Sequence, residues 1–333
     1  MNSSKNLSIF LLISFTICLS NFSSIACAKA KIKKSTVNTS KNTKTETRNK
    51  AKTEDVQDDL LKILKDDYPT FVKNLGDNIK DPKFRAAIKS LSTANKVNST
   101  IITVPVVYSI PTQNEIDVEK SLKLALTSVA SARDFLFCTG PVRIANKTIV
   151  TSAGGKYVID GHHRWSQVYS INSKCSMACL DLTDIKDPIN ALKGTQLGIA
   201  AGQDKNGNDI TSIPVAIVEG KNLLKFSQAD LSAYVLQTIT ADVLKVFKEF
   251  NAAIDTNQKV ADYIWTNIAL MQKNNQPISG APGRSVMPQT DMAVNWPSVA
   301  VNADKVLQVS FTTSGFVFTN FFAMIALLFV VFF

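Results

Sequence analysis

Apolar positions in the central part of the chain change their spacing in a way that predicts alternating strands and helices. Ile101 to Tyr108 is β-branched and bounded by turns, which indicates a strand, whereas Val118 to Ala130 has apolar residues at helical spacing. Similar β-prone runs predict strands at Val142 to Ala145, Thr148 to Thr151, Lys156 to Ile159, Met177 to Leu182 and Pro214 to Val218. A helix is expected over Pro188 to Ala201. This alternation predicts an α/β fold.

Helical patterns stand on both sides of this region. Asp55 to Lys65 has apolar residues at helical spacing, and Asp81-Pro82 is typical of the start of a second helix that runs through Leu91. Long amphipathic segments with no strand between them follow at Ala229 to Ile239, Ala241 to Asn251 and Gln258 to Lys273. We therefore expect a helical C-terminal subdomain, followed by a Pro/Gly-rich loop over Pro277 to Pro288.

Each end of the chain carries a hydrophobic run typical of a processing signal. Residues 1–28 combine Lys5, an apolar stretch and the small residues of Ala26-Cys27-Ala28, which favours a cleaved signal peptide over an uncleaved anchor. The apolar run 316–333 ends the chain without flanking cations, which favours a glycolipid-anchor signal over a plain tail helix. Small residues beginning at Asn302 predict the attachment site, with Ser314 and Gly315 as the weaker alternative. We expect a protein of the secretory pathway, held at the cell surface.

Composition agrees with a folded central region and locates the charge outside it. The 333 residues are 45% hydrophobic and 19% charged, enough for a buried core. Residues 29–53 contain nine Lys and Arg residues and one acidic residue, Glu46, so this leader holds +8 of the net charge of +10. The folded part is therefore nearly neutral, which argues against a basic nucleic-acid-binding face and leaves a role for nucleic acid open. We expect a disordered leader that contacts acidic polymers weakly.

Together these features divide the chain into seven segments. They are a signal peptide (1–28), a basic leader (29–54), lead-in helices (55–100), an α/β domain (101–225), a helical subdomain with the Pro/Gly loop (226–291), a linker containing the anchor attachment site (292–315) and the hydrophobic tail (316–333).

Cysteines and sequons agree with export. Removal of the signal peptide leaves Cys138, Cys175 and Cys179, so one disulfide and one free thiol are expected, with three pairings open. Asn-x-Ser/Thr sequons predict glycosylation at Asn38, Asn98 and Asn146.

Both histidines of the chain lie in one motif, Asp160-Gly161-His162-His163-Arg164-Trp165, where a predicted strand meets a predicted helix. Glycine allows a tight turn, and the first helical N–H groups point outward with the positive end of the helix dipole. Such a helix start binds phosphate or carboxylate, and Arg164 would add a bidentate donor. Asp160 is a candidate to hold a metal ion or to orient an imidazole.

A structural interpretation of the same motif is that Asp160 caps the helix, Arg164 pairs with a surface carboxylate and the histidines form local hydrogen bonds. Four polar residues around one glycine, Asp160, His162, His163 and Arg164, favour the ligand site over that alternative.

The motif resembles the ParB/sulfiredoxin-like superfamily, whose glycine-containing strand-to-helix motif binds nucleotide phosphates. The similarity extends from about Val104 to Asp291. Its supporting segments are Ile110 to Asp117, Ala191 to Ala201, Gly220 to Leu224 and Gly283 to Asp291. The resemblance implies a mixed sheet with flanking helices, and a nucleotide or other phosphorylated small molecule as ligand, accompanied by a divalent cation such as magnesium.

Departures from the superfamily pattern limit the activity that can be carried over. Sulfiredoxins have a catalytic cysteine directly after the motif glycine, where this chain has His162, so sulfinic acid reduction is not expected. The arginine-rich boxes and helix-turn-helix of chromosome-partitioning ParB proteins have no clear match after Ala229.

The motif is most similar to that of a ParB-like free-serine kinase. That resemblance implies that Asp160, His162, His163 and Arg164 face the phosphates, with Glu115 or Asp117 as the catalytic base. Arg284, in the Pro/Gly loop, is either a second anion clamp or a solvated side chain.

Three hypotheses follow from the sequence. In the first, the protein binds a phosphorylated ligand at Gly161, His162, His163 and Arg164 and acts on it by phosphoryl transfer or phosphodiester hydrolysis. In the second, the protein is a non-enzymatic surface module that binds a ligand or has a structural role. In the third, it is an extracellular nuclease that depends on a divalent ion.

Overall fold

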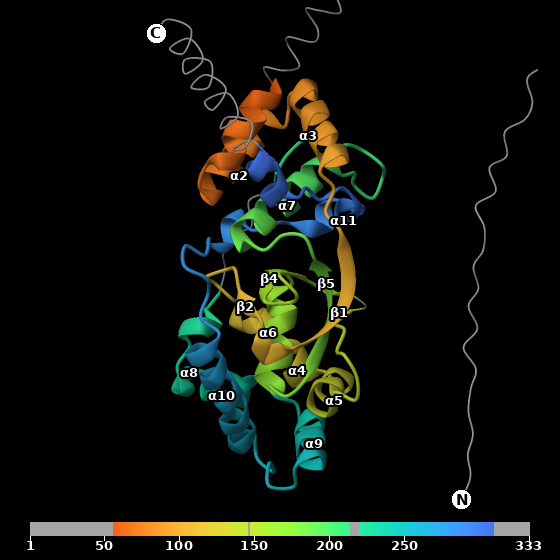
Figure 1. Cartoon of the computed structure of the whole chain (residues 1–333). Coiled ribbons are helices and arrows are strands. Elements are labelled where there is room, and N and C mark those ends of the chain that lie inside the picture. The colour runs from red at the N-terminus through yellow and green to blue at the C-terminus, as the bar shows by residue number, and fades with distance from the viewer. Residues whose placement is uncertain (1–55, 146, 214–219, 310–333) are drawn as a thin grey trace, which may run out of the picture. The chain divides into compact units, whose positions relative to one another are not determined.

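The computed structural model describes residues 56–145, 147–213 and 220–309, shown in colour in Figure 1. The expected signal peptide, the whole leader, the strand expected over Pro214 to Val218 and the apolar tail lie outside the described residues, as do the sequons at Asn38 and Asn146.

A five-stranded mixed sheet forms the centre of the described chain, in the order β1-β5-β3-β4-β2 (Figure 1). The strands are β1 (Ser99–Pro105), β2 (Ile110–Pro111), β3 (Ile149–Ser152), β4 (Tyr157–Asp160) and β5 (Ser176–Leu182). β1 pairs antiparallel with β5 and β3 antiparallel with β4, whereas β3 with β5 and β2 with β4 are parallel. The predicted α/β class with a mixed sheet and flanking helices is confirmed.

Helices before, between and after the strands make up most of the remaining described structure. They are residues 56–65, α2 (Tyr68–Asn78), α3 (Pro82–Ala94), α4 (Val118–Thr127), α5 (Val129–Phe137), α6 (His162–Ile171), α7 (Pro188–Ala201), α8 (Gln228–Thr238), α9 (Ala241–Phe250), α10 (Asn257–Asn274), α11 (Trp296–Val299) and residues 303–309. Short 3-10 turns are η1 (Val106–Tyr108), η2 (Leu223–Lys225), η3 (Arg284–Val286) and η4 (Thr290–Met292). The three expected helices of the C-terminal part are confirmed as α8, α9 and α10. None of the helices traced here combines the length and apolarity that a membrane span requires.

Three sequence predictions were wrong and one helix was missed. The expected helix Val118 to Ala130 is two helices, because Ser128 is extended and its hydroxyl accepts the Ser131 N–H at the start of α5. The strand expected to reach Tyr108 ends at Pro105 and continues as η1. Val142 to Ala145 makes only isolated bridges in the described structure. The helix α2 was missed; Asp67 caps it and Pro69 lies in its first turn.

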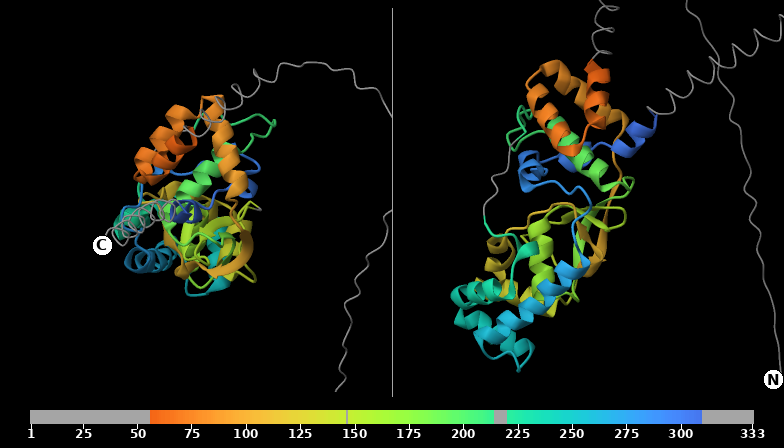
Figure 2. Two further views of the ribbon diagram at one scale, coloured as in Figure 1. Left: turned by 45° about the horizontal axis from the view of Figure 1, so that its top comes forward. Right: turned by 90° about the vertical axis from the view of Figure 1, so that its left-hand side faces the viewer.

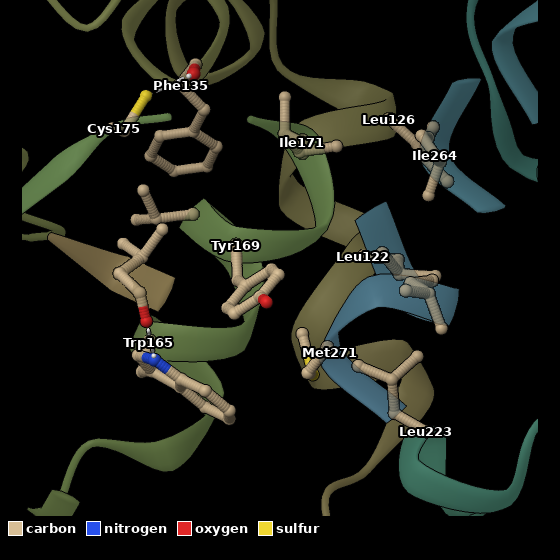
Figure 3. Close-up of a cluster of buried hydrophobic side chains, with 14 of the residues drawn as sticks. Leu122, Leu126, Phe135, Trp165, Tyr169, Ile171, Cys175, Leu223, Ile264 and Met271 are labelled. Carbon is tan, nitrogen blue, oxygen red and sulfur yellow. Dashed lines mark hydrogen bonds between the residues drawn. The ribbon is translucent and has the colours of Figure 1, made fainter. Parts of the chain in front are cut away.

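The sheet separates two hydrophobic cores, because neighbouring residues of its central strands point to opposite faces. Ile149 and Val158 belong to the first core, which contains α4, α5, α6 and the C-terminal helices α8 to α10. Val150 and Ile159 belong to the second core, which contains α2, α3, α7 and α11. Figure 3 shows part of the first core around Trp165. Both faces of β3 and β4 are therefore covered, and the strand β4 that leads into the motif is held from both sides.

A segment near the C-terminus returns to pack on α7. The Val301 N–H donates to the Gly194 carbonyl at 3.1 Å, and a β-carbon at Gly194 would lie 2.1 Å from the Val301 carbonyl oxygen. One turn further along α7, a β-carbon at Gly198 would lie 2.8 Å from the Ala300 Cα. The two glycines give the room that this close approach needs, and Figure 2 shows the returning segment in blue against the green α7. Residues 292–309 of the expected linker thus contribute to the second core.

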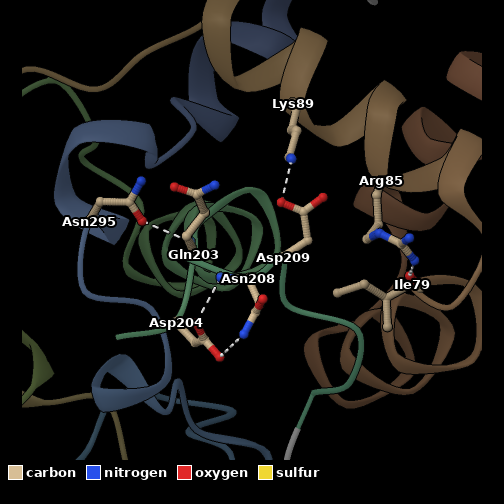
Figure 4. A network of polar contacts seen from close by, with 8 residues as sticks. All are labelled: Ile79, Arg85, Lys89, Gln203, Asp204, Asn208, Asp209 and Asn295. Atoms are coloured by element: carbon tan, nitrogen blue, oxygen red, sulfur yellow. Dashed lines mark hydrogen bonds and ion pairs between the residues drawn. The ribbon is translucent and has the colours of Figure 1, made fainter. Parts of the chain in front are cut away.

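Polar contacts tie the N-terminal helices to the rest. Lys193 of α7 is buried, and its ammonium donates to the Leu64 and Asp66 carbonyls at 2.8 and 2.6 Å, at the end of helix 56–65. Lys89 of α3 forms an ion pair with Asp209 in the loop after α7 at 2.7 Å (Figure 4). The expected lead-in helices are therefore packed against the α/β part.

Candidate functional site

The motif lies where β4 passes directly into α6, as the sequence predicted. Gly161 has a φ of 90° and ψ of 27°, the left-handed region that favours glycine, and its carbonyl accepts the Trp165 N–H at 2.9 Å. Trp165 is fully buried and its indole N–H donates to the Val106 carbonyl at 2.9 Å, the dashed contact in Figure 3. Tyr169, one turn later, donates to Asn275 Oδ1 at 2.8 Å. The core thus fixes the position of the helix start.

The start of α6 differs from those of α2, α3, α4, α5, α7, α8, α9 and α10. Each of those begins at an Asp, Ser or Thr whose side chain accepts a backbone N–H, whereas α6 begins at Gly161 without a side-chain cap. Within the described ranges, the backbone N–H groups of His162, His163 and Arg164 have no hydrogen-bond acceptor. Three donors at the positive end of a helix dipole are available to an anion.

Arg164 folds back over the glycine. Its Nη2 donates to Asp160 Oδ2 at 3.0 Å and to the Thr148 carbonyl oxygen at 3.3 Å. With 22% and 21% of their side chains exposed, Arg164 and Asp160 are largely shielded from solvent. Burial raises the pKa of the Asp160 carboxyl, and the positive charge of Arg164 opposes that rise. The buried Nε of Arg164 has no partner among the described residues, so one guanidinium donor is unused.

His162 points into the protein. Only 3% of the residue is exposed, and its Nε2 accepts the Thr112 backbone N–H at 3.1 Å. Burial, together with the nearby His163 and Arg164, lowers the pKa of His162 to about 3. The imidazole is therefore neutral at physiological pH, and its Nε2 is occupied. Its predicted catalytic role remains a prediction, whereas its backbone N–H belongs to the free donors of the helix start.

His163 lies among cations. Its Nε2 accepts the Asp117 backbone N–H at 3.2 Å. Burial and, in decreasing order, the charges of Arg284, Lys120 and Arg164 together lower the pKa of His163 to about 3. These three cations come from η3, α4 and α6, so distant parts of the chain bring positive charge to the start of α6.

The two candidate bases lie beside a cavity of about 370 Å³. Glu115 Oε2 accepts the Arg284 backbone N–H at 3.1 Å, and Asp117 Oδ1 accepts the Lys120 N–H at 2.7 Å as the cap of α4. Arg284 also lines this cavity, and its Nη1 is buried without a partner among the described residues. Further lining comes from polar and basic side chains: Asn114, Lys221, Asn222, Lys225 and Gln276.

Asp160 and Arg164 line a different cavity, of about 430 Å³, together with Trp296 and the ion pair of Lys147 with Asp291 at 2.5 Å. The side chains of the motif therefore face different directions. His163 lies with Asp117 and Arg284 on the side of the first cavity, whereas Asp160 and Arg164 line the second.

Sequence reasoning missed three contributors to this site: Thr112, Lys120 and Thr148. Thr112 lies within Ile110 to Asp117, one of the segments that carry the resemblance, and this membership could have marked it as a site residue. Nothing in the sequence marks Lys120 or Thr148, because their importance arises from the packing of α4 and β3 against the motif.

Metal ligation by Asp160 remains a prediction. In the part of the chain that the structure describes, no three His, Cys, Asp or Glu residues are grouped so as to hold a metal ion. Asp160 offers one carboxylate, already paired with Arg164, so a divalent cation would need further ligands from the bound molecule or from water.

Cys138 and Cys175 form a disulfide, and Cys179 is a buried free cysteine. This selects one of the three pairings that the sequence left open. The expected outcome of one bridge and one free thiol among these three cysteines is confirmed.

Asn302, the predicted lipid-attachment residue, is buried and its Oδ1 accepts the Lys305 N–H at the start of helix 303–309. Asp304 accepts hydrogen bonds from the Lys186 N–H and the Asn190 amide. Attachment at Asn302 would release residues that are packed in the second core, whereas the alternative at Ser314 and Gly315 lies outside the described residues.

Comparison with known proteins found no matching family model, no matching curated protein and no matching solved structure.

Proposed function

We propose that this protein binds a nucleotide or another phosphorylated small molecule at the start of α6, in a ParB/sulfiredoxin-like domain. The observation that carries the proposal is the convergence of Arg164, Arg284 and Lys120 around His163, next to three backbone N–H groups without acceptors among the described residues. Cations and free helix N-terminal donors together favour a multiply charged anion.

The proposed ligand contacts follow from this arrangement. Phosphate oxygens accept from the N–H groups of His162, His163 and Arg164. Arg284 supplies positive charge from the cavity of about 370 Å³, and Arg164 supplies it from the side of the second cavity. The cavity of about 370 Å³ beside Arg284 has room for the rest of a small ligand. A magnesium ion would arrive with the nucleotide and meet Asp160 only if the ion pair with Arg164 opens.

Catalysis at this site, by phosphoryl transfer or phosphodiester hydrolysis, requires a base near the phosphate. Glu115 and Asp117 both line the cavity of about 370 Å³, and each uses one carboxylate oxygen to accept a backbone N–H. We prefer Glu115, because it contacts the loop of Arg284 rather than capping a helix. Neither imidazole is suited to proton transfer near neutral pH in this conformation, since each Nε2 accepts a backbone N–H. That observation favours the second candidate function, a surface module that binds its ligand without turnover.

Titration calorimetry on the purified protein tests the binding proposal. Inorganic phosphate, ADP and ATP are added with and without magnesium, and saturable binding is expected for at least one of them. Arg164→Ala and Arg284→Ala should each weaken it at least tenfold, corresponding to about 1.4 kcal/mol. Arg133→Ala is the matched control, because Arg133 forms an exposed ion pair with Glu249 on α9, away from the motif. Equal affinity in all four proteins would disprove the site.

Turnover assays separate the two candidate functions. Release of ADP or inorganic phosphate from ATP, and cleavage of a plasmid with a divalent ion, are measured for the wild type and for Glu115→Gln. Binding without either reaction supports the non-enzymatic module, whereas turnover that Glu115→Gln abolishes supports the enzyme.

We also propose that the protein is exported and held at the cell surface by a C-terminal lipid anchor, with the basic leader contacting acidic polymers outside the cell. The support is the sequence of the two ends and the disulfide between Cys138 and Cys175, which suits an oxidising compartment. Release from intact cells by a phosphatidylinositol-specific phospholipase is the expected result. Resistance to that enzyme combined with extraction by detergent would indicate a tail helix instead.

A further inference from the structure

The strand β1 has an open edge. It is the last strand of the sheet and pairs with β5 on one side. At its two ends the Asn98 carbonyl accepts the Thr183 N–H and the Val106 N–H donates to the Cys175 carbonyl, both at 3.0 Å. Even-numbered residues of this strand therefore turn their backbone groups to β5, and odd-numbered residues turn theirs away.

The outward-facing residues are Ser99, Ile101 and Thr103, and no described residue forms a hydrogen bond with their backbone groups. The strand has no charged residue, and Ile101 is 55% exposed. Uncharged, β-branched edges pair with other chains unless a charge, a proline or a covering group prevents it. Pro105 provides such a block at one end, because it has no N–H to offer on the open side.

At the other end, Asn98-Ser99-Thr100 is an N-glycosylation sequon that leads into the strand. Asn98 and Thr100 are both exposed, so the acceptor amide and the hydroxyl of the sequon are accessible. The Asn98 Nδ2 donates to Asp184 Oδ2 at 2.5 Å, which uses one of its two hydrogens and leaves the other for a glycosidic bond. The Asn98 backbone is held by Thr183, so a glycan would extend from a fixed position.

We propose that Asn98 carries an N-linked glycan and that this glycan covers the open edge of β1, which otherwise pairs with the same edge of a second copy. The inference rests on the proposed export. In the attachment step, Asn98 Nδ2 replaces the diphosphate on the anomeric carbon of a polyprenyl-diphosphate oligosaccharide. The C–O bond breaks as the C–N bond forms, Nδ2 loses one proton and the polyprenyl diphosphate leaves. A bulky hydrophilic group at this position prevents edge-to-edge pairing, as lysine side chains on edge strands do in other proteins.

The test uses the full chain behind an added cleavable signal peptide, so that entry into the secretory pathway does not depend on residues 1–28. Asn38→Gln and Asn146→Gln remove the other two sequons after residue 28, and mass spectrometry measures the occupancy of Asn98. An unmodified Asn98 on the exported chain would overturn the proposal. The chain that depends on residues 1–28 for export is compared with the chain that has the added signal. If the first stays inside the cell while the second is glycosylated at Asn98, the result contradicts the proposed export but not the glycosylation.

Edge covering is tested on the folded glycoprotein. Enzymatic removal of the glycan should shift the sedimentation of the protein from monomer to dimer or larger species. Ile101→Lys should restore the monomer after deglycosylation, because it places a charge on the exposed edge strand. Leu236→Lys on α8 is the matched control, since Leu236 is 47% exposed but lies outside the sheet. A deglycosylated protein that stays monomeric, or an equal rescue by both lysines, would overturn the covering role.

Discussion

The guanidinium of Arg164 lies directly over Gly161, so that a β-carbon at Gly161 would be 2.8 Å from Arg164 Nη2. The glycine therefore serves two purposes at the start of α6. It adopts the left-handed backbone that joins β4 to the helix, and it leaves the space in which Arg164 meets Asp160.

Gly161→Ala should reduce both stability and phosphate binding. The left-handed backbone costs a residue with a β-carbon about 1–2 kcal/mol, and the methyl group displaces Arg164 from Asp160. Gly207→Ala is the matched control, because Gly207 has a φ of 81° but no atom within 4 Å of an added β-carbon. Urea denaturation should show a similar loss for both variants, whereas calorimetry should show weaker binding of phosphate or nucleotide for Gly161→Ala alone. Unchanged binding in Gly161→Ala would contradict the role given to Arg164.

Gly194→Ala should destabilise the protein by about 1–3 kcal/mol, because the added methyl group meets the Val301 backbone oxygen and forces the returning segment away from α7. Gly76→Ala on α2 provides the comparison. Its β-carbon would meet only Ile213 Cβ, at 3.9 Å, so this variant should be neutral or more stable by up to about 1 kcal/mol. Thermal and urea unfolding measure both. A loss of equal size in the two variants would contradict the role given to the contact with Val301, because helix propensity alone favours alanine in both.

Stability should fall as the pH is lowered from about 6.5 toward 3. The pKa values of His162 and His163 are lowered from 6.5 to about 3 in the folded protein, so the unfolded chain binds more protons than the folded one across that window. Each imidazole then contributes a slope of about 1.4 kcal/mol per pH unit. The free energy of unfolding is measured by urea denaturation at several pH values.

Glutamine variants separate the imidazoles from the carboxyl groups, which also titrate in this range. His163→Gln keeps an acceptor near the Nε2 position and should remove about half of the histidine slope, and His162→Gln with His163→Gln should remove nearly all of it. Asp160 titrates in every variant, so its contribution cancels in the comparison. A slope that is unchanged in the double variant would mean that the imidazoles are not held neutral.

In the protein without residues 1–28, which contain Cys18 and Cys27, thiol labelling should find no reactive cysteine in the folded state and one, Cys179, after denaturation. Burial and the nearby Asp181 raise the pKa of the Cys179 thiol to about 12, which suppresses the reactive thiolate. Replacing Cys138 and Cys175 together by serine should cost roughly 3–4 kcal/mol, because the bridge closes a loop between residues 37 apart in sequence. Two or more labelled cysteines in the denatured, unreduced protein would contradict the pairing.

The local elements around the motif were predictable because their signals are local. β-branched residues before Asp160, a glycine at the turn and an apolar repeat beginning at Trp165 are enough to place a strand, a tight turn and a helix. The split between α4 and α5 was not predictable from periodicity, since Ser128 interrupts an apolar pattern that continues on both sides.

The sequence by itself determined the α/β class, the junction of β4 with α6 and the concentration of both histidines there, because these depend on residues a few positions apart. Only the tertiary structure decided that the ring of His162 faces the core and that Arg284 lies near His163, 121 positions earlier in the chain. Only tertiary packing also showed that Gly194 receives the segment around Val301. Contacts between distant residues arise from the packing of whole elements, and the spacing of residues along one element does not record them.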